Sequence, residues 1–145
     1  MRKLISIFFI FLFSLAFAQK NENYIRIDFS SICCGPPSEK PLVDFIENFR
    51  QENKLKDFEI WQETGLGYEG EYALYIGIDQ FKCKKKKKEK FITGMKTLIN
   101  TFTEKRNNNQ DGHINFREEL VKKEELIKKQ KTPSNRFSKM LLYKH

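Results

Sequence analysis

Residues 24–49 read YIRIDFSSICCGPPSEKPLVDFIENF, and two periodicities follow each other in this segment, first that of a strand and then that of a helix. Apolar and polar side chains alternate over residues 24–32, which is typical of a strand with one buried face. The glycine and two prolines of residues 35–37 end that strand. Ser38 is a candidate cap for the helix that follows. The helix is predicted by an apolar stripe with helical spacing: Leu42, Phe45, Ile46 and Phe49.

Further along the chain the same criteria predict two more strands, a second helix and a final strand. The strands are residues 58–62 and 72–78, separated by a glycine-containing loop at residues 65–70. Asp79 is the expected cap of the second helix, and residues 112–116 are the expected last strand. The second helix is predicted by its inner stripe: Phe91, Met95, Leu98 and Phe102, flanked by Ile92 and Ile99.

This order, β-α-β-β-α-β, resembles the ferredoxin-like fold. We therefore expect an α+β, ferredoxin-like βαββαβ two-layer sandwich with an extra C-terminal helix. A right-handed crossover of the first unit leads us to expect the first and third strands as parallel neighbours, with both helices on one face. Over residues 117–131 Glu and Lys recur four residues apart, which predicts a mostly solvated helix with a thin apolar stripe at Leu120, Val121 and Ile127.

The first residues have the pattern of an export signal. Arg2 and Lys3 precede an apolar run, and the small side chains of Ala16 and Ala18 form a cleavage site. The apolar run is shorter than the ~20 residues of a membrane-spanning helix, so we expect no span after cleavage. The expected organisation is a cleaved signal peptide (1–18), an α+β domain (19–116) and a charged C-terminal helix and tail (117–145), in the periplasm or secreted.

The chain is basic, with 27 Lys and Arg against 19 Asp and Glu. Its net charge is +8, or +6 once Arg2 and Lys3 leave with the signal. Lysine supplies most of this charge, whereas bidentate recognition of phosphates and bases is typical of arginine, and we expect no nucleic-acid partner. An anionic envelope polymer or lipid headgroups are the expected partners. The candidate anion-binding residues are Lys82, Lys84, Lys85, Lys86, Lys87, Lys88 and Lys90, with an ordinary solvated helix end as the alternative.

Cys33, Cys34 and Cys83 all lie beyond the signal. In an oxidising compartment an odd number of cysteines predicts one disulfide with one remaining thiol, or a metal site. If the first and third strands are parallel neighbours, the three sulfurs meet at one end of the sheet. We expect a disulfide from Cys83 to Cys33 or Cys34. The alternatives are a vicinal Cys33–Cys34 bond and a redox or soft-metal site for Cu(I) or zinc.

The location of Cys33 and Cys34 is similar to that of the metal-binding cysteines of ferredoxin-like metal-carrying domains, which lie between the first strand and the first helix. Those domains use C-x-x-C, whereas here the two cysteines are adjacent. The resemblance is therefore one of location.

Residues 107–118 resemble an EF-hand calcium loop. Oxygen-bearing side chains occupy positions 1, 3 and 5, a glycine occupies position 6 and a glutamate occupies position 12. Position 1 is an asparagine where the motif has aspartate, so this resemblance implies weak Ca²⁺ binding. The alternative is an Asn-rich turn into the last strand. The candidate metal residues are Asn107, Asn109, Asp111, His113 and Glu118.

The two histidines, His113 and His145, suggest no Cys/His or Ser/His pair for nucleophilic catalysis. We therefore expect an exported, monomeric and non-enzymatic binding or interaction domain, whose ligand the residues do not identify. One alternative is a thiol protein that binds a soft metal or exchanges disulfides through Cys33, Cys34 and Cys83. The other is a calcium-stabilised module.

Overall fold

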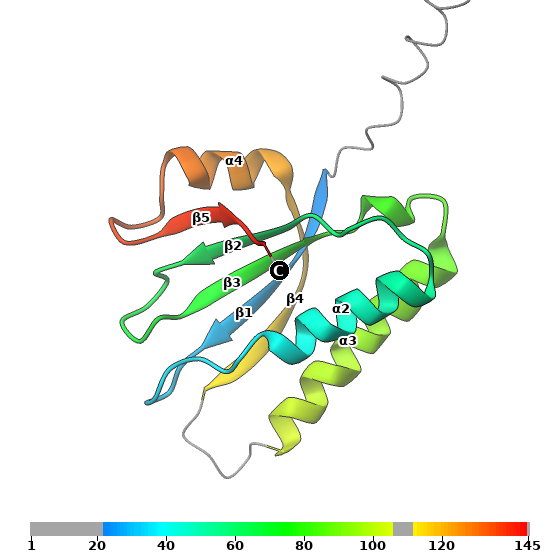
Figure 1. The fold of residues 1–145 in the computed structure, drawn as a ribbon. Helices are drawn as coiled ribbons and strands as arrows, with labels where there is room; N and C mark the ends of the chain where they lie inside the picture. Colours follow the sequence, from blue (N-terminus) through cyan, green and yellow to red (C-terminus); the bar gives the residue numbers. More distant parts are fainter. Residues whose placement is uncertain (1–21, 106–111, 145) are drawn as a thin grey trace, which may run out of the picture.

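A computed structural model describes residues 22–105 and 112–144. Figure 1 shows a sheet with the two long helices side by side on one face and a short helix on the other. The elements in chain order are β1 (Asn23–Ser30), α2 (Lys40–Glu52), β2 (Ile60–Thr64), β3 (Tyr72–Gly77), the 3₁₀ helix η2 (Asp79–Phe81), α3 (Lys85–Lys105), β4 (His113–Lys122), α4 (Lys123–Lys131) and β5 (Lys139–Leu142).

The sheet has five strands in the order β4-β1-β3-β2-β5, and every neighbouring pair is antiparallel. The expected α+β class is thus confirmed. The fifth strand, β5, comes from the segment expected to be a tail, and its residues pair with β2 from Trp61↔Leu142 to Thr64↔Lys139.

β1 and β3 are neighbours, as expected, but they are antiparallel, so the predicted parallel pairing is wrong. The crossover through α2 makes β1 and β2 run in the same direction. The β2–β3 hairpin then returns β3 between them in the opposite direction. As a result, the carboxyl end of β1 lies beside the start of β3, where Phe29 pairs with Tyr72.

The larger core lies between the sheet and the α2/α3 layer. β1 contributes Ile25, Ile27 and Phe29 to it, as the alternation predicted. Five phenylalanines form its aromatic centre, with Phe58 and Phe91 stacked at 4.9 Å between ring centroids. The other three members of this aromatic cluster are Phe45, Phe49 and Phe81.

A second, smaller core occupies the opposite face of the sheet, which the sequence analysis had left to solvent. Tyr24, Ala73 and Tyr75 are fully buried there. Leu126 of α4 and Met140 of β5 cover them. The sheet therefore has apolar contacts on both faces, and α4 with β5 covers part of the second.

The predicted helix over residues 117–131 is wrong in its first half. Residues up to Lys122 belong to β4 and pair with β1, and α4 begins only at Lys123. β4 therefore continues through position 116, where the expected domain ended. Lys122 N donates to Glu125 Oε1 at 3.1 Å, and this bond helps to start α4.

Asp79 does not cap the second helix as expected. Its carboxylate accepts hydrogen bonds from the backbone of Glu22 and Asn23 and from Asn23 Nδ2, so it holds the start of β1. A 3₁₀ turn follows, and α3 begins at Lys85. Ser38 Oγ accepts a bond from Lys40 N at 3.2 Å, while the cap position of α2 is Glu39.

Candidate functional site

An open trough runs along the sheet face that α4 only partly covers. It consists of two cavities of about 500 Å³ and 280 Å³, which share Arg26 and Arg117 in their linings. Tyr75 of β3 contributes to the larger cavity. The two walls of the larger cavity are the end of β4 and the side of α4. They carry Glu118, Glu119, Val121, Glu125 and Lys129.

The trough contains a carboxylate held between two guanidinium groups. Arg26 Nε lies 2.6 Å from Asp28 Oδ1, and Arg117 Nε lies 2.6 Å from Asp28 Oδ2. The Asp28 side chain is 10% exposed, whereas that of Arg117 is 60% exposed. Among the described residues, these are the only hydrogen bonds or ion pairs of the two guanidiniums. The trio therefore carries a net positive charge, and its terminal nitrogens can donate to a further anion.

A bulge in β4 positions Arg117 at this point. Ile25 pairs with Leu120, but Ile27 pairs with Phe116, so residues 117–119 lie opposite the single residue Arg26. Bulges of this kind redirect side chains and are frequent beside binding sites. Here the bulge places Arg117 over Asp28 and brings two acidic side chains to the rim of the trough.

A buried carboxylate holds α4 against the sheet beside the trough. Glu63 is 1% exposed and accepts hydrogen bonds from Tyr75 Oη at 2.5 Å and Lys129 Nζ at 2.7 Å. Burial raises the pKa of Glu63, but the bonds from Lys129 and Tyr75 outweigh it and bring that pKa below its usual value. Burial and the bond to Glu63 raise the pKa of Tyr75. The cluster is thus a charged, hydrogen-bonded support for α4.

Glu59 makes a comparable cluster at the other end of α4. Its Oε1 accepts hydrogen bonds from Tyr24 Oη at 2.9 Å, Trp61 Nε1 at 2.9 Å and Lys123 Nζ at 2.8 Å. Burial, followed by this bond to Glu59, raises the pKa of Tyr24. Lys123 and Lys129 therefore tie both ends of the short helix to the sheet.

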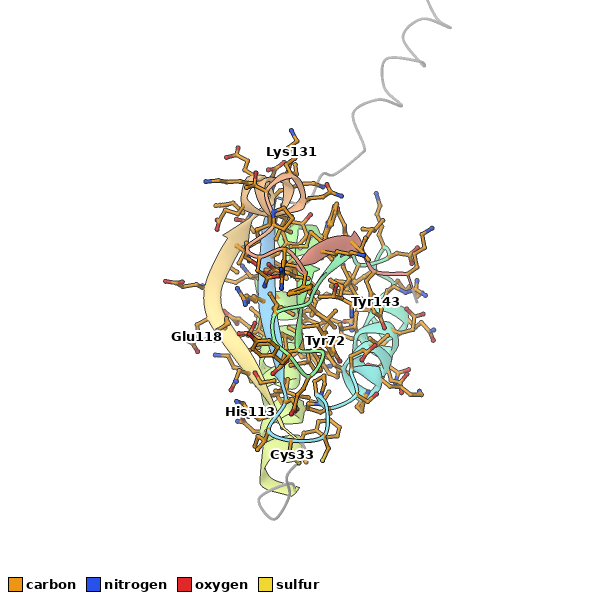
Figure 2. The ribbon with its side chains drawn as sticks, turned by 90° about the vertical axis from the view of Figure 1, so that its left-hand side faces the viewer. Cys33, Tyr72, His113, Glu118, Lys131 and Tyr143 are labelled. Carbon is orange, nitrogen blue, oxygen red and sulfur yellow. The ribbon has the colours of Figure 1, made fainter. Side chains whose placement is uncertain are left out.

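The three cysteines do not meet, and the predicted disulfide from Cys83 is absent. All three lie in the described residues, are exposed and form no disulfide. Cys33 and Cys34 follow β1, whereas Cys83 follows β3, and the antiparallel pairing puts the carboxyl ends of these two strands at opposite ends of the sheet. Figure 2 shows Cys33 at the end of the molecule away from α4. The Sγ atoms of Cys33 and Cys34 are 2.7 Å apart, at a bend in the chain.

The candidate calcium residues Asn107, Asn109 and Asp111 lie outside the described residues. His113 begins β4, so a strand follows the loop where an EF-hand has a helix. Glu118 lies six positions beyond Gly112 along the strand, a span of about 20 Å at ~3.3 Å per residue. Glu118 Oε1 accepts a bond from Lys96 Nζ at 2.5 Å instead.

Within residues 22–105 and 112–144, no group of three or more His, Cys, Asp or Glu side chains is placed to hold a metal ion.

The lysine run follows β3 and η2 and surrounds the start of α3. Lys87 and Lys88 are half-buried, and Lys87 Nζ donates to Asn53 O at 3.3 Å. The positive end of the helix dipole is also at this end, so the helix gains no stability from these charges. The remaining lysines of the run are exposed: Lys82, Lys84, Lys85, Lys86 and Lys90.

The comparisons with known proteins identify no relative, because no protein-family model, curated protein or solved structure matches the chain significantly. Among the described residues, no helix combines the length and apolar character needed to cross a membrane.

Arg26, Asp28 and Arg117 were not predicted as site residues. The available signal was the placement of Arg26 and Asp28 on one face of β1 beside Tyr24, an aromatic residue on the face left to solvent. An aromatic side chain there indicates that this face is partly covered.

Proposed function

We propose that the chain is an exported, monomeric and non-enzymatic binding domain that holds an anionic ligand in the trough. The observation that carries the proposal is the Arg26–Asp28–Arg117 trio, in which one carboxylate is shared by two guanidiniums. Arg26 and Arg117 line a cavity of about 500 Å³ whose walls also carry Glu118, Glu119 and Glu125. This volume is large enough for a small organic anion or one group of a polymer.

Arginine favours ligands with planar or tetrahedral oxyanions, because its guanidinium nitrogens form paired hydrogen bonds with carboxylates and phosphates. Glu119 and Glu125 on the walls of the trough favour hydrogen-bond donors elsewhere on the ligand. The positive net charge of the chain would steer such an anion toward the surface. Anionic envelope polymers and lipid headgroups both carry groups of this class.

Calorimetric titration of the chain from Gln19 onward with tripolyphosphate tests the proposal. Arg117→Gln should weaken binding about ten- to hundredfold, because a hydrogen bond to a charged group is worth ~1.5–3 kcal/mol. Arg136→Gln is the matched control. It removes the same charge from an arginine stacked on Phe137, outside the trough, and should change the affinity less than about threefold.

The lysine run at the start of α3 is the alternative binding site for the anion. A Lys85→Gln/Lys86→Gln variant should retain most of the affinity if the ligand lies in the trough. Loss of binding in this variant, with Arg117→Gln unaffected, would move the site to the start of α3. If the unaltered chain did not bind tripolyphosphate, the proposal that its ligand is an anion would be contradicted.

We propose export on the pattern of residues 1–18, which lie outside the described residues. N-terminal sequencing of the protein recovered from the periplasm or medium of an export-competent host should begin at Gln19. Retention of Met1 in a membrane or cytoplasmic fraction would contradict export.

A single species at the monomer mass in light scattering would support the monomeric state, and a dimer would contradict it.

We further propose that β1 to β4 form a ferredoxin-like sandwich to which α4 and β5 have been added. The order β-α-β-β-α-β and the strand order β4-β1-β3-β2 support this assignment. An experimental structure in which β4 did not pair with β1 would contradict it.

A further inference from the structure

The loop after β1 brings two thiols together at an exposed edge of the molecule. The Sγ atoms of Cys33 and Cys34 lie 2.7 Å apart, and both residues are exposed. Ser31 Oγ accepts a hydrogen bond from Gly35 N at 3.1 Å, which closes the loop around the two cysteines. Gly35 has φ +93°, a conformation that residues with a side chain rarely adopt.

The bond from Ser31 and the conformation of Gly35 hold the dithiol together before any partner arrives. Ser31 Oγ also donates to Glu69 of the β2–β3 loop, so the loop is attached to the rest of this edge. Pro36 and Pro37 restrict the chain where it leaves the loop. Such a dithiol loses little conformational freedom when its sulfurs react with each other.

We propose that Cys33 and Cys34 form a redox dithiol that reduces disulfides of a partner protein or small molecule by thiol–disulfide exchange. One cysteine thiolate attacks a sulfur of the substrate disulfide, forming a mixed disulfide and releasing one substrate thiolate. The neighbouring thiolate then attacks the cysteine sulfur of that mixed disulfide and releases the second substrate thiolate. The protein loses two electrons and ends with a Cys33–Cys34 disulfide, the substrate gains two electrons, and the two thiol protons pass through solvent to the released thiolates.

Two features favour this chemistry over a metal site. Exchange needs only the two sulfurs that the loop supplies, whereas no cluster of three or more metal-ligating side chains occurs within the described part of the chain. A disulfide between adjacent cysteines would remain at the surface, because both residues are exposed, and an external thiol could attack it there. The pair can therefore be regenerated by an external thiol.

Oxidised glutathione tests the proposal, with non-reducing peptide mapping of the full mature chain as the readout. The unaltered protein should lose two hydrogens from the peptide that contains both cysteines and should carry little glutathione there. The second step is intramolecular, with an effective concentration of the order of millimolar or higher, so it should outcompete micromolar glutathione. Dithiothreitol should restore both thiols.

Single-cysteine variants and Cys83 supply the controls. Cys33→Ser and Cys34→Ser should each accumulate a stable glutathione adduct, because neither can complete the second step. Cys83 is exposed and lies toward the opposite end of the sheet, so Cys83→Ser should leave the result unchanged. Glutathione adducts on Cys33 and Cys34 without ring closure, a disulfide to Cys83, or no reaction at either cysteine would each overturn the proposal.

Discussion

Glu63 is one of the residues that attach α4 to the sheet. Its carboxylate is 1% exposed, and Lys129 supplies its ion pair. Lys129→Met keeps most of the side-chain length but leaves that charge buried without its partner. We expect the free energy of unfolding to fall by about 3 kcal/mol, measured by urea denaturation. Lys128→Met, an exposed neighbour, should change it by less than about 0.5 kcal/mol, and equal effects in both variants would contradict a structural role for the pair.

The same carboxylate predicts a pH dependence of stability. In the folded state its pKa lies below the ordinary value of 4.5, so Glu63 stabilises the fold at pH values above 4.5. That contribution should decline as the pH falls through the lower, folded-state pKa. Urea denaturation between pH 7 and pH 3 should therefore show a steeper loss of stability in the unaltered chain than in Glu63→Gln. Parallel curves would show that Glu63 does not contribute to acid unfolding.

At the scale of the element, α4 is anchored by a single apolar side chain. Leu126 is its one buried residue and is 0% exposed, whereas the adjacent Ile127 is 37% exposed. Leu126→Ala should cost about 2–4 kcal/mol through lost burial and a cavity. Ile127→Ala, which removes a similar volume from the surface, should cost less than about 1 kcal/mol. Equal losses would indicate that α4 does not pack as described.

Helices and strands whose apolar residues repeat with a regular spacing could be predicted from the sequence. Those that depend on pairing or packing with distant segments could not. The apolar stripe of α2 and the alternation in β1 each identify an element without reference to the rest of the chain. Residues 117–122 carry the Glu/Lys spacing of a helix, yet they extend β4, because Leu120, Val121 and Lys122 pair with β1 beyond the bulge. Leu126 was missed for the same reason, since one apolar residue forms no period.

At the scale of the whole molecule, the trough results from incomplete coverage of the second sheet face. Helices α2 and α3 cover the first face completely enough to exclude water from a large core, and this layer was predictable from their stripes. The trough depends on the β4 bulge and on the contact between Arg117 and Asp28, which are 89 residues apart. No local pattern specifies that register, so the candidate site could not be read from the sequence.

Binding in the trough is tested most directly by NMR titration of isotope-labelled protein with tripolyphosphate, following the backbone amides and the arginine Nε–H groups. We predict the largest shifts at the Nε–H groups of Arg26 and Arg117 and at the amides of residues 117–119. The amides of residues 85–90 should change little. Largest shifts in the lysine run, or no shift at either arginine at saturating ligand, would contradict the trough as the binding site.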